Sequence, residues 1–206
     1  MIDNSDTVTE VFTSKERSYL YLLFAELFLG NGKKIKNLLA GEEILSSPSE
    51  TGHVDDLNKL IQSLQDVPER ELKILYENLF LIPGAFYVPP YGAYYLYSKN
   101  DDVSTSDFIA EIAKEYQAEG FLDYAEGMYL RLDHLGIMFM YLHFLLEKDG
   151  DMVETEKKIR SFIESKINPW FGGFEKKVST SLEYGFYLDL VRFIHQFLDM
   201  QGKKDM

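Results

Sequence analysis

The chain has 206 residues, 46% of them hydrophobic and 15% aromatic, so it is long enough and apolar enough to bury a core of its own. It contains no cysteine, which excludes disulfides, zinc–cysteine sites and thiol catalysis. The 34 acidic residues outnumber the 21 basic ones and give a net charge of −13, so nucleic acids and anionic membrane surfaces are poor partners.

The residues before position 81 place apolar side chains at helical spacing. Thr13 and Glu16 have the spacing of a capping box, and the helix that they open is expected to end at Gly30. Three more helices are predicted over residues 33–45, 53–65 and 66–80. In the last of these, the apolar side chains fall on one face: Leu72, Leu75, Tyr76, Leu79 and Phe80.

Residues 81–97, LIPGAFYVPPYGAYYLY, interrupt the helical pattern. They include no charged residue, three of the six prolines and six aromatic rings. Pro83, Pro89 and Pro90 forbid a continuous helix, because proline lacks the backbone N–H and disfavours helical geometry in the residue before it. Since loops are usually polar, this stiff apolar segment either packs over the core as a tucked loop or forms one wall of a binding groove.

The second half of the chain returns to helical spacing. A helix is predicted over residues 104–120, and another over residues 135–146 is apolar nearly all round, as expected for the centre of a bundle. The remaining predicted elements are a helix over residues 154–168 closed by Asn168 and Pro169, an aromatic turn over residues 170–174 and a helix over residues 178–198.

These elements predict an all-α fold: a single-domain helical bundle of about seven or eight helices around a central apolar helix, covering residues 1–206. Residues 1–12 and 201–206 are expected to be flexible tails. The opening residues MIDNSDTVTE are polar and acidic, unlike a signal peptide, and the sequence has no apolar window of about twenty residues. We therefore expect a cytoplasmic protein without a membrane span.

Nucleotide and metal motifs are weak in this sequence. GNGKK at residues 30–34 lacks the phosphate-loop spacing and follows a helix rather than a strand, so we interpret it as a helix end and a turn. His134 and His143 are nine residues apart, which places them on opposite sides of a helix. We expect no cofactor and no metal site.

Asp133 and His134 stand where a polar stretch turns into the central apolar helix. One interpretation is structural, with Asp133 capping the helix and His134 as a polar group with satisfied hydrogen bonds in its first turn. The other is functional, with the pair holding a proton or orienting a ligand. Because the sequence suggests neither a nucleophile nor an oxyanion-stabilising group, we expect no enzyme activity.

Two stretches together resemble the TorD/DmsD family of redox-enzyme maturation chaperones, which are related to nitrate reductase assembly chaperones. YENLFLIPGAFYVPPYGAYY resembles the family's Tyr-x-x-Leu-Phe, Pro-Gly and Pro-Pro-aromatic signature. LRLDHLGIMFMYLHFLL is similar to its x-Asp-His motif and the apolar helix that follows. The segment NPWFGGFEKKV is also similar to the family's Trp-x-x-Phe turn and the start of its long C-terminal helix. Two departures mark a divergent branch: Leu130-Arg131 replaces the family's Glu-Pro, and Gly92-Ala93 replaces its Glu-Ser.

The resemblance implies an all-helical chaperone that is not an enzyme. Such a protein binds the twin-arginine signal peptide and the apo form of a molybdopterin oxidoreductase subunit, and holds it until its cofactor is inserted before export. Carboxylates would bind the arginines, and an apolar groove would bind the remainder of the peptide. On the resemblance, the expected peptide-binding residues are Tyr76, Leu79, Phe80, Pro89, Pro90, Tyr91, Tyr95, Asp133 and His134.

Within this set, the helix face at Tyr76, Leu79 and Phe80 would border the groove. Pro89, Pro90, Tyr91 and Tyr95 would form its stiff wall. Asp133 and His134 would form its polar anchor. Two rivals use the same residues: a small-molecule or peptide binding protein with the same aromatic pocket and, as the weakest alternative, an enzyme with Asp133 and His134 as an acid–base pair. The oligomeric state is left open between monomer and dimer.

Overall fold

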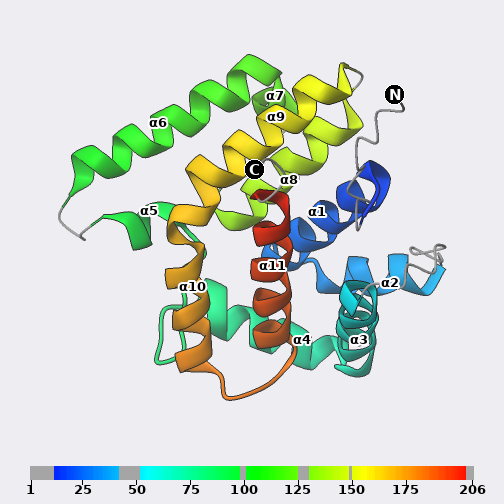
Figure 1. Ribbon diagram of the computed structural model, residues 1–206. Helices are drawn as coiled ribbons and strands as arrows, with labels where there is room; N and C mark the ends of the chain where they lie inside the picture. Colours follow the sequence, from blue (N-terminus) through cyan, green and yellow to red (C-terminus); the bar gives the residue numbers. More distant parts are fainter. Residues whose placement is uncertain (1–11, 42–51, 98–100, 125–129, 149, 203–206) are drawn as a thin grey trace, which may run out of the picture.

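The computed structural model describes residues 12–41, 52–97, 101–124, 130–148 and 150–202, and every regular element within these ranges is a helix (Figure 1). The α-helices are α1 (Ser14–Phe28), α2 (Gly32–Gly41), α3 (Gly52–Asp66), α4 (Glu69–Tyr76), α5 (Gly92–Leu96), α6 (Asp102–Glu119), α7 (Phe121–Tyr124), α8 (Leu135–Glu147), α9 (Met152–Phe162), α10 (Asn168–Ser181) and α11 (Phe186–Gly202). Two π-helical turns, Glu77–Leu81 and Ile163–Ile167, extend α4 and join α9 to α10. The all-α prediction is confirmed.

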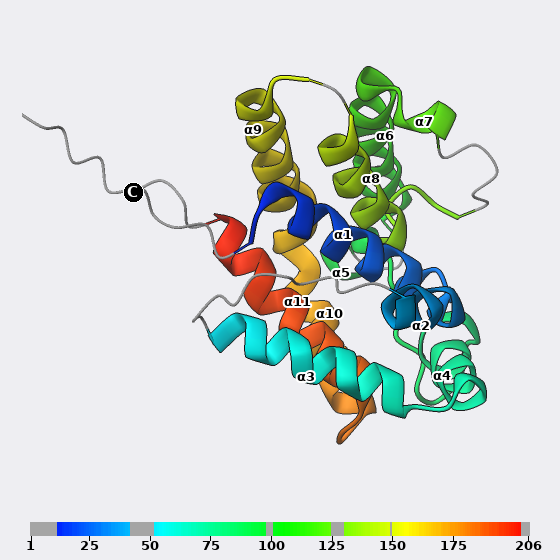
Figure 2. The same ribbon diagram turned by 90° about the vertical axis from the view of Figure 1, so that its right-hand side faces the viewer.

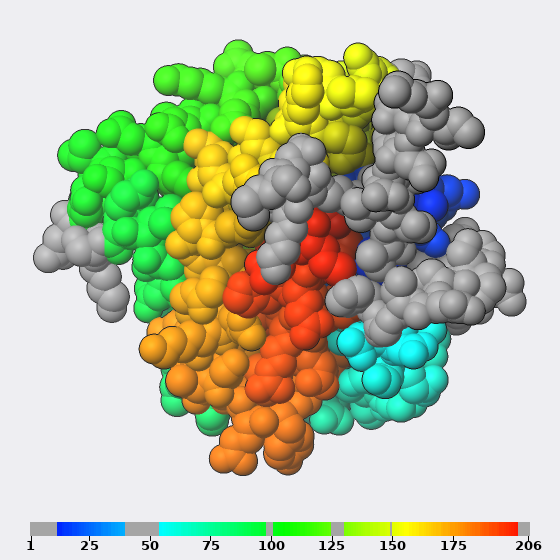
Figure 3. Space-filling view, in the orientation of Figure 1, coloured from blue at the N-terminus to red at the C-terminus, as the bar shows by residue number. Residues whose placement is uncertain are grey.

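The helices form two groups that meet at α1 and α8 (Figures 1 and 2). Helices α6, α7 and α9 lie at one end with α8, while α2, α3, α4, α10 and α11 lie at the other. On one face of the molecule α10 and α11 run side by side, with α3 next to α11 (Figure 3). This arrangement keeps α8 in the interior.

The prediction of a central apolar helix is confirmed by α8, whose residues from Leu135 to Leu142 are all buried. Its ring at Phe139 packs against Phe24 of α1, with ring centroids 5.4 Å apart, and also contacts Tyr21 and Phe28. Gly136 allows this close approach, because a Cβ there would lie 3.1 Å from the carbonyl oxygen of Ala25. The α1–α8 pair is therefore the centre of the aromatic core.

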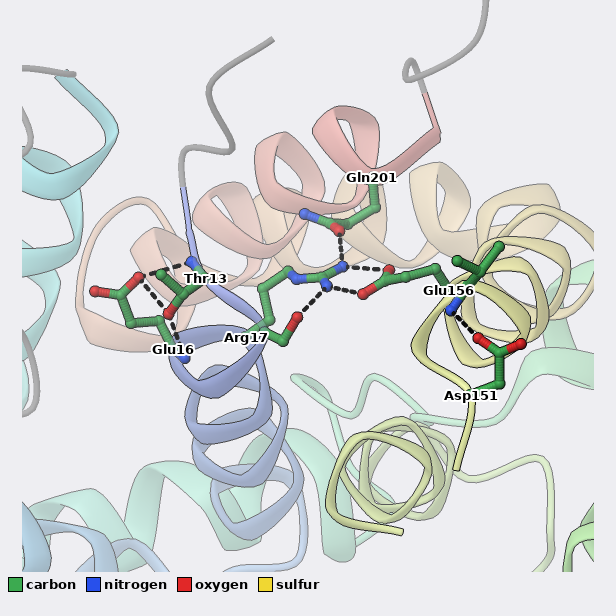
Figure 4. Close-up of polar contacts among 8 residues, drawn as sticks. Thr13, Glu16, Arg17, Asp151, Glu156 and Gln201 are labelled. Atoms are coloured by element: carbon green, nitrogen blue, oxygen red, sulfur yellow. Dashed lines mark hydrogen bonds and ion pairs between the residues drawn. The ribbon is translucent and has the colours of Figure 1, made fainter. Parts of the chain in front are cut away.

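A partly buried ion pair ties three helices together away from this centre (Figure 4). The guanidinium of Arg17 in α1 donates to both carboxylate oxygens of Glu156 in α9, and also to Gln201 in α11 at 3.0 Å. The Arg17 side chain is 3% exposed. Next to it, Thr13 and Glu16 form the predicted capping box, with the Thr13 N–H donating to Glu16 at 2.7 Å.

The predicted elements after residue 154 are partly wrong. Asn168 and Pro169 begin α10 instead of closing a helix, because the π-helical turn before them keeps the chain helical and proline is tolerated in a first turn. The predicted aromatic turn at residues 170–174 lies inside α10. The predicted helix over residues 178–198 is interrupted before α11, where Gly185 adopts a positive φ of 118°.

The predicted helix count is too low, because α10 and α11 are separate and the short helices α5 and α7 were not anticipated. The inner ends of the two predicted tails lie within the described residues. Phe12 is buried against Phe197, with ring centroids 5.8 Å apart, and residues 201–202 belong to α11. Residues 1–11, 203–206 and the end of the predicted 33–45 helix lie outside the described residues.

Two further properties of the same described ranges concern membranes and metal ions. No helix there is both long and apolar enough to cross a membrane. The described residues also contain no group of three histidine, aspartate or glutamate side chains placed to hold a metal ion.

Candidate peptide-binding site

The two motifs that carry the family resemblance lie side by side. The N–H of Leu135 donates to the carbonyl of Pro90 at 2.8 Å, and the N–H of Gly92 donates to the carbonyl of Asp133 at 3.0 Å. Tyr91 and His134 form an isolated antiparallel bridge between these bonds. The backbone thus fixes the proline-rich segment against the start of α8, forty residues further along the chain.

Asp133 is fully buried and holds the start of α5 in place. Its Oδ2 accepts the N–H of Ala93 at 3.0 Å. Its two carboxylate oxygens also accept two N–H groups of Arg131, Nε at 2.8 Å and Nη2 at 2.6 Å. The interpretation of Asp133 as the cap of the central helix is wrong, because its oxygens bind these other donors.

Arg131 is a member of this cluster that the sequence reasoning did not select. Its side chain is 47% exposed, and its guanidinium carbon lies 4.8 Å from the centre of the Tyr91 ring. The only sequence signal was the departure from the family's Glu-Pro at this position. Arg131 binds a carboxylate that has no exposed surface in this conformation.

His134, not Asp133, caps α8. Its Nδ1 accepts the N–H of Gly136 at 3.1 Å, and its ring meets the Tyr91 ring edge to face at a centroid distance of 5.0 Å. Burial lowers the pKa of His134 to about 4, an effect that Asp133 opposes and Arg131 reinforces. A neutral imidazole that is 2% exposed and already bonded to backbone suits a structural role better than proton transfer.

The low pKa of His134 predicts a pH dependence of stability. Its pKa is about 4 in the folded chain and about 6.5 when unfolded, so between these values the unfolded chain binds the extra proton. This contribution to the free energy of unfolding is complete above about pH 6.5 and falls by about 3 kcal/mol as the pH drops to about 4. Denaturant titrations across this range measure the loss.

His134→Asn provides the control, because asparagine is a good N-cap that does not titrate. Its stability is expected to fall less steeply over the same pH range. Parallel curves for the variant and the unsubstituted protein would show that His134 does not carry the dependence.

The predicted helix face at the end of α4 points into the core. Leu79 and Phe80 are 1% and 3% exposed. The ring of Phe80 is packed between those of Phe28 and Tyr187, at centroid distances of 5.2 and 5.1 Å. Tyr76 is half-buried and donates its hydroxyl to the carbonyl of Phe28 at 3.2 Å. Only Tyr76 of these three offers surface to a ligand in this conformation.

Tyr76 borders a cleft of about 340 Å³ between the start of α2, helix α4 and Tyr187. Lys33, Glu69 and Arg70 stand at its edge. A smaller apolar hollow of about 130 Å³ lies elsewhere, among α1, α2 and α3. Neither space is lined by the Asp133–His134 pair.

The proline-rich segment divides into two parts. Its second part is tucked in: Pro89 and Pro90 are buried, and Tyr95 is half-buried, stacked on Trp170 at 5.8 Å with its hydroxyl donated to Pro89 at 3.0 Å. Tyr91 is also half-buried. For these residues the tucked-loop interpretation describes the conformation, and whether a peptide contacts them stays a prediction.

The first part of the segment is open. We call residues 81–86 the exposed apolar segment, because all six are exposed and Leu81, Ile82 and Phe86 are 55%, 51% and 58% accessible. It begins at the last residue of the π-helical turn, where the N–H of Ile82 donates to the carbonyl of Glu77 at 2.8 Å, and it ends two residues before Val88, whose N–H donates to the carbonyl of Leu79. The sequence reasoning missed these side chains, although the absence of charge over residues 81–97 was the signal that pointed to them.

Comparison with known proteins gives two matches that cover these motifs. A family described as nitrate reductase delta subunit matches residues 47–176, which include residues 81–97 and the Asp133–His134 pair. A protein from a Psychrobacter species, named "Chaperone protein TorD", is 26% identical over 213 residues, covering 92% of each chain.

Proposed function

The chain belongs to the nitrate reductase delta subunit family and is a TorD-type redox-enzyme maturation chaperone, and from this premise we propose that it binds the twin-arginine signal peptide of one molybdopterin-dependent oxidoreductase. It binds the apoprotein as well and retains it in the cytoplasm until the cofactor is inserted. The chaperone itself uses no cofactor and catalyses no reaction.

The observation that carries the proposal is the exposed apolar segment on a chain with a net charge of −13. Scattered exposed apolar side chains are ordinary, but three large ones within six consecutive residues are a concentration that partners often cover. A twin-arginine leader combines two cations with an apolar stretch. Its apolar stretch suits Leu81, Ile82 and Phe86, and its cations suit the acidic surface.

The leader's arginines are proposed to engage carboxylates, of which Asp133 is the candidate that the family resemblance implies. Its two oxygens match the planar fork of a guanidinium group, which lysine lacks. The proline-rich backbone supports such binding, because prolines and the bonds from Gly92 and Leu135 hold the site in shape before the peptide arrives.

Truncation of the exposed apolar segment tests this proposal. Phe86→Ser is expected to weaken leader binding about tenfold, because it removes a large apolar contact. Its thermal stability should stay close to that of the unsubstituted protein, because the ring is 58% exposed. Titration calorimetry with the synthetic leader measures the affinity, and thermal unfolding measures the stability.

Val153→Ser is the matched control, because Val153 is 64% exposed and lies on α9, in the other group of helices. It should leave leader affinity unchanged. Equal losses in both variants, or no loss in Phe86→Ser, would remove the exposed apolar segment from the binding surface.

A further inference from the structure

The buried carboxylate of Asp133 lies in a site that already binds a guanidinium group. The two N–H groups of Arg131 meet its two oxygens at 2.8 and 2.6 Å, and the guanidinium stacks on Tyr91 at 4.8 Å. A planar fork facing a carboxylate and lying over an aromatic ring is a geometry that selects arginine over lysine. The occupant in this structure comes from the chain itself.

The occupant is placed so that it can leave. Arg131 is only two residues from Asp133 and is 47% exposed, so its departure breaks a short-range ion pair and the stacking on Tyr91 but no backbone bond of the site. The bonds that shape the site are made by backbone groups: His134 donates to the Arg131 carbonyl at 2.9 Å, and Leu135 donates to that of Pro90 at 2.8 Å. The Arg131 side chain takes part in neither.

We propose that Arg131 is an internal competitor that occupies the arginine site of Asp133 and must be displaced by an arginine of the client peptide. This inference rests on the proposed function. Competition lowers the apparent affinity by the fraction of molecules in which the site is free. Arg131 therefore sets specificity, because only a peptide that also gains contacts elsewhere, such as at the exposed apolar segment, displaces it.

Competition and a purely structural ion pair predict different results. If Arg131 competes with the peptide, removing it should strengthen binding of the leader. Arg131→Gln is expected to bind the twin-arginine leader about tenfold more tightly or better, since charge-assisted bonds no longer have to be broken first. The gain should vanish in the Arg131→Gln, Asp133→Asn double variant. A leader with both arginines changed to lysine should gain little, because lysine cannot make the fork.

Two controls separate competition from other effects. Arg192→Gln makes the same change in net charge on exposed α11 surface and should leave affinity near that of the unsubstituted protein. Arg131→Lys keeps the charge and loses the fork, so its gain should be smaller than that of Arg131→Gln. It also serves as the test variant if Arg131→Gln fails to fold, which thermal unfolding reveals.

Calorimetry with the full chain and the synthetic leader gives distinguishable results. Tighter binding by Arg131→Gln alone supports the competitor. Unchanged or weaker binding by Arg131→Gln, in a protein whose unsubstituted form binds the leader, overturns the competitor and leaves the proposed function standing. Failure of both the unsubstituted and the Arg131→Gln proteins to bind any leader overturns the proposed function itself.

Discussion

Replacing Phe139 with alanine is expected to lower the free energy of unfolding by about 3–5 kcal/mol, the range for deleting a fully buried phenylalanine ring. Phe139 lies on α8 with no exposed surface and contacts three rings of α1 at Tyr21, Phe24 and Phe28. The side chains around the cavity are held by both helices and can collapse only partly. Chemical denaturation measures the loss.

Phe144→Ala is the comparison, because Phe144 is on the same helix but is only half-buried, against Phe121 and Tyr124. Its cost should be clearly smaller than that of Phe139→Ala. Equal costs would contradict the placement of the core centre between α1 and α8.

Replacing Glu156 with glutamine is expected to lower the free energy of unfolding by about 1.5–3 kcal/mol, the range for hydrogen bonds to charged groups. The variant leaves the positive charge of Arg17 inside the protein, where its side chain is 3% exposed. Gln201 and Ser14 still accept hydrogen bonds from the guanidinium, so the expected loss is that of the charge-assisted bonds to Glu156. Chemical denaturation again provides the measurement.

Glu154→Gln makes the same chemical change two residues earlier on α9, at an exposed position, and should cost little. A Glu156→Gln protein as stable as the Glu154→Gln protein would show that the ion pair does not stabilise the junction of α1, α9 and α11.

Much of the fold was predictable because helical periodicity is a local signal. The capping box at Thr13 and the all-round apolar character of α8 placed two of the central elements. The errors arose where local signals compete. Pro169 is compatible both with a helix end and with a first helical turn, and the π-helical turn that selects the second is set by tertiary packing.

The break before α11 shows a different limit. Apolar side chains continue at helical spacing on both sides of Gly185, so periodicity alone joins two helices that the positive φ of this residue separates. A single glycine inside a helical pattern is often tolerated. The sequence therefore did not decide between an interrupted and a continuous helix.

The site was less predictable than the fold. The resemblance assigned the proline-rich segment and the Asp133–His134 pair to one site, and the two lie side by side in the structure. Apolar spacing could not tell a groove from a core, so Leu79 and Phe80 were assigned to a binding face although both are buried. The ion pair between Arg131 and Asp133 was also not predicted, because residues two apart in an irregular turn have no periodic signal.

The most direct test of the account is titration calorimetry of the full chain with synthetic twin-arginine leaders from the molybdopterin oxidoreductases of the same genome. One leader is expected to bind with a dissociation constant of about 1 μM or less. Its affinity should fall with added salt and when both arginines become lysine, because partly exposed ion pairs are screened and lysine lacks the fork. Absence of binding to every leader and every corresponding apoenzyme would contradict the account.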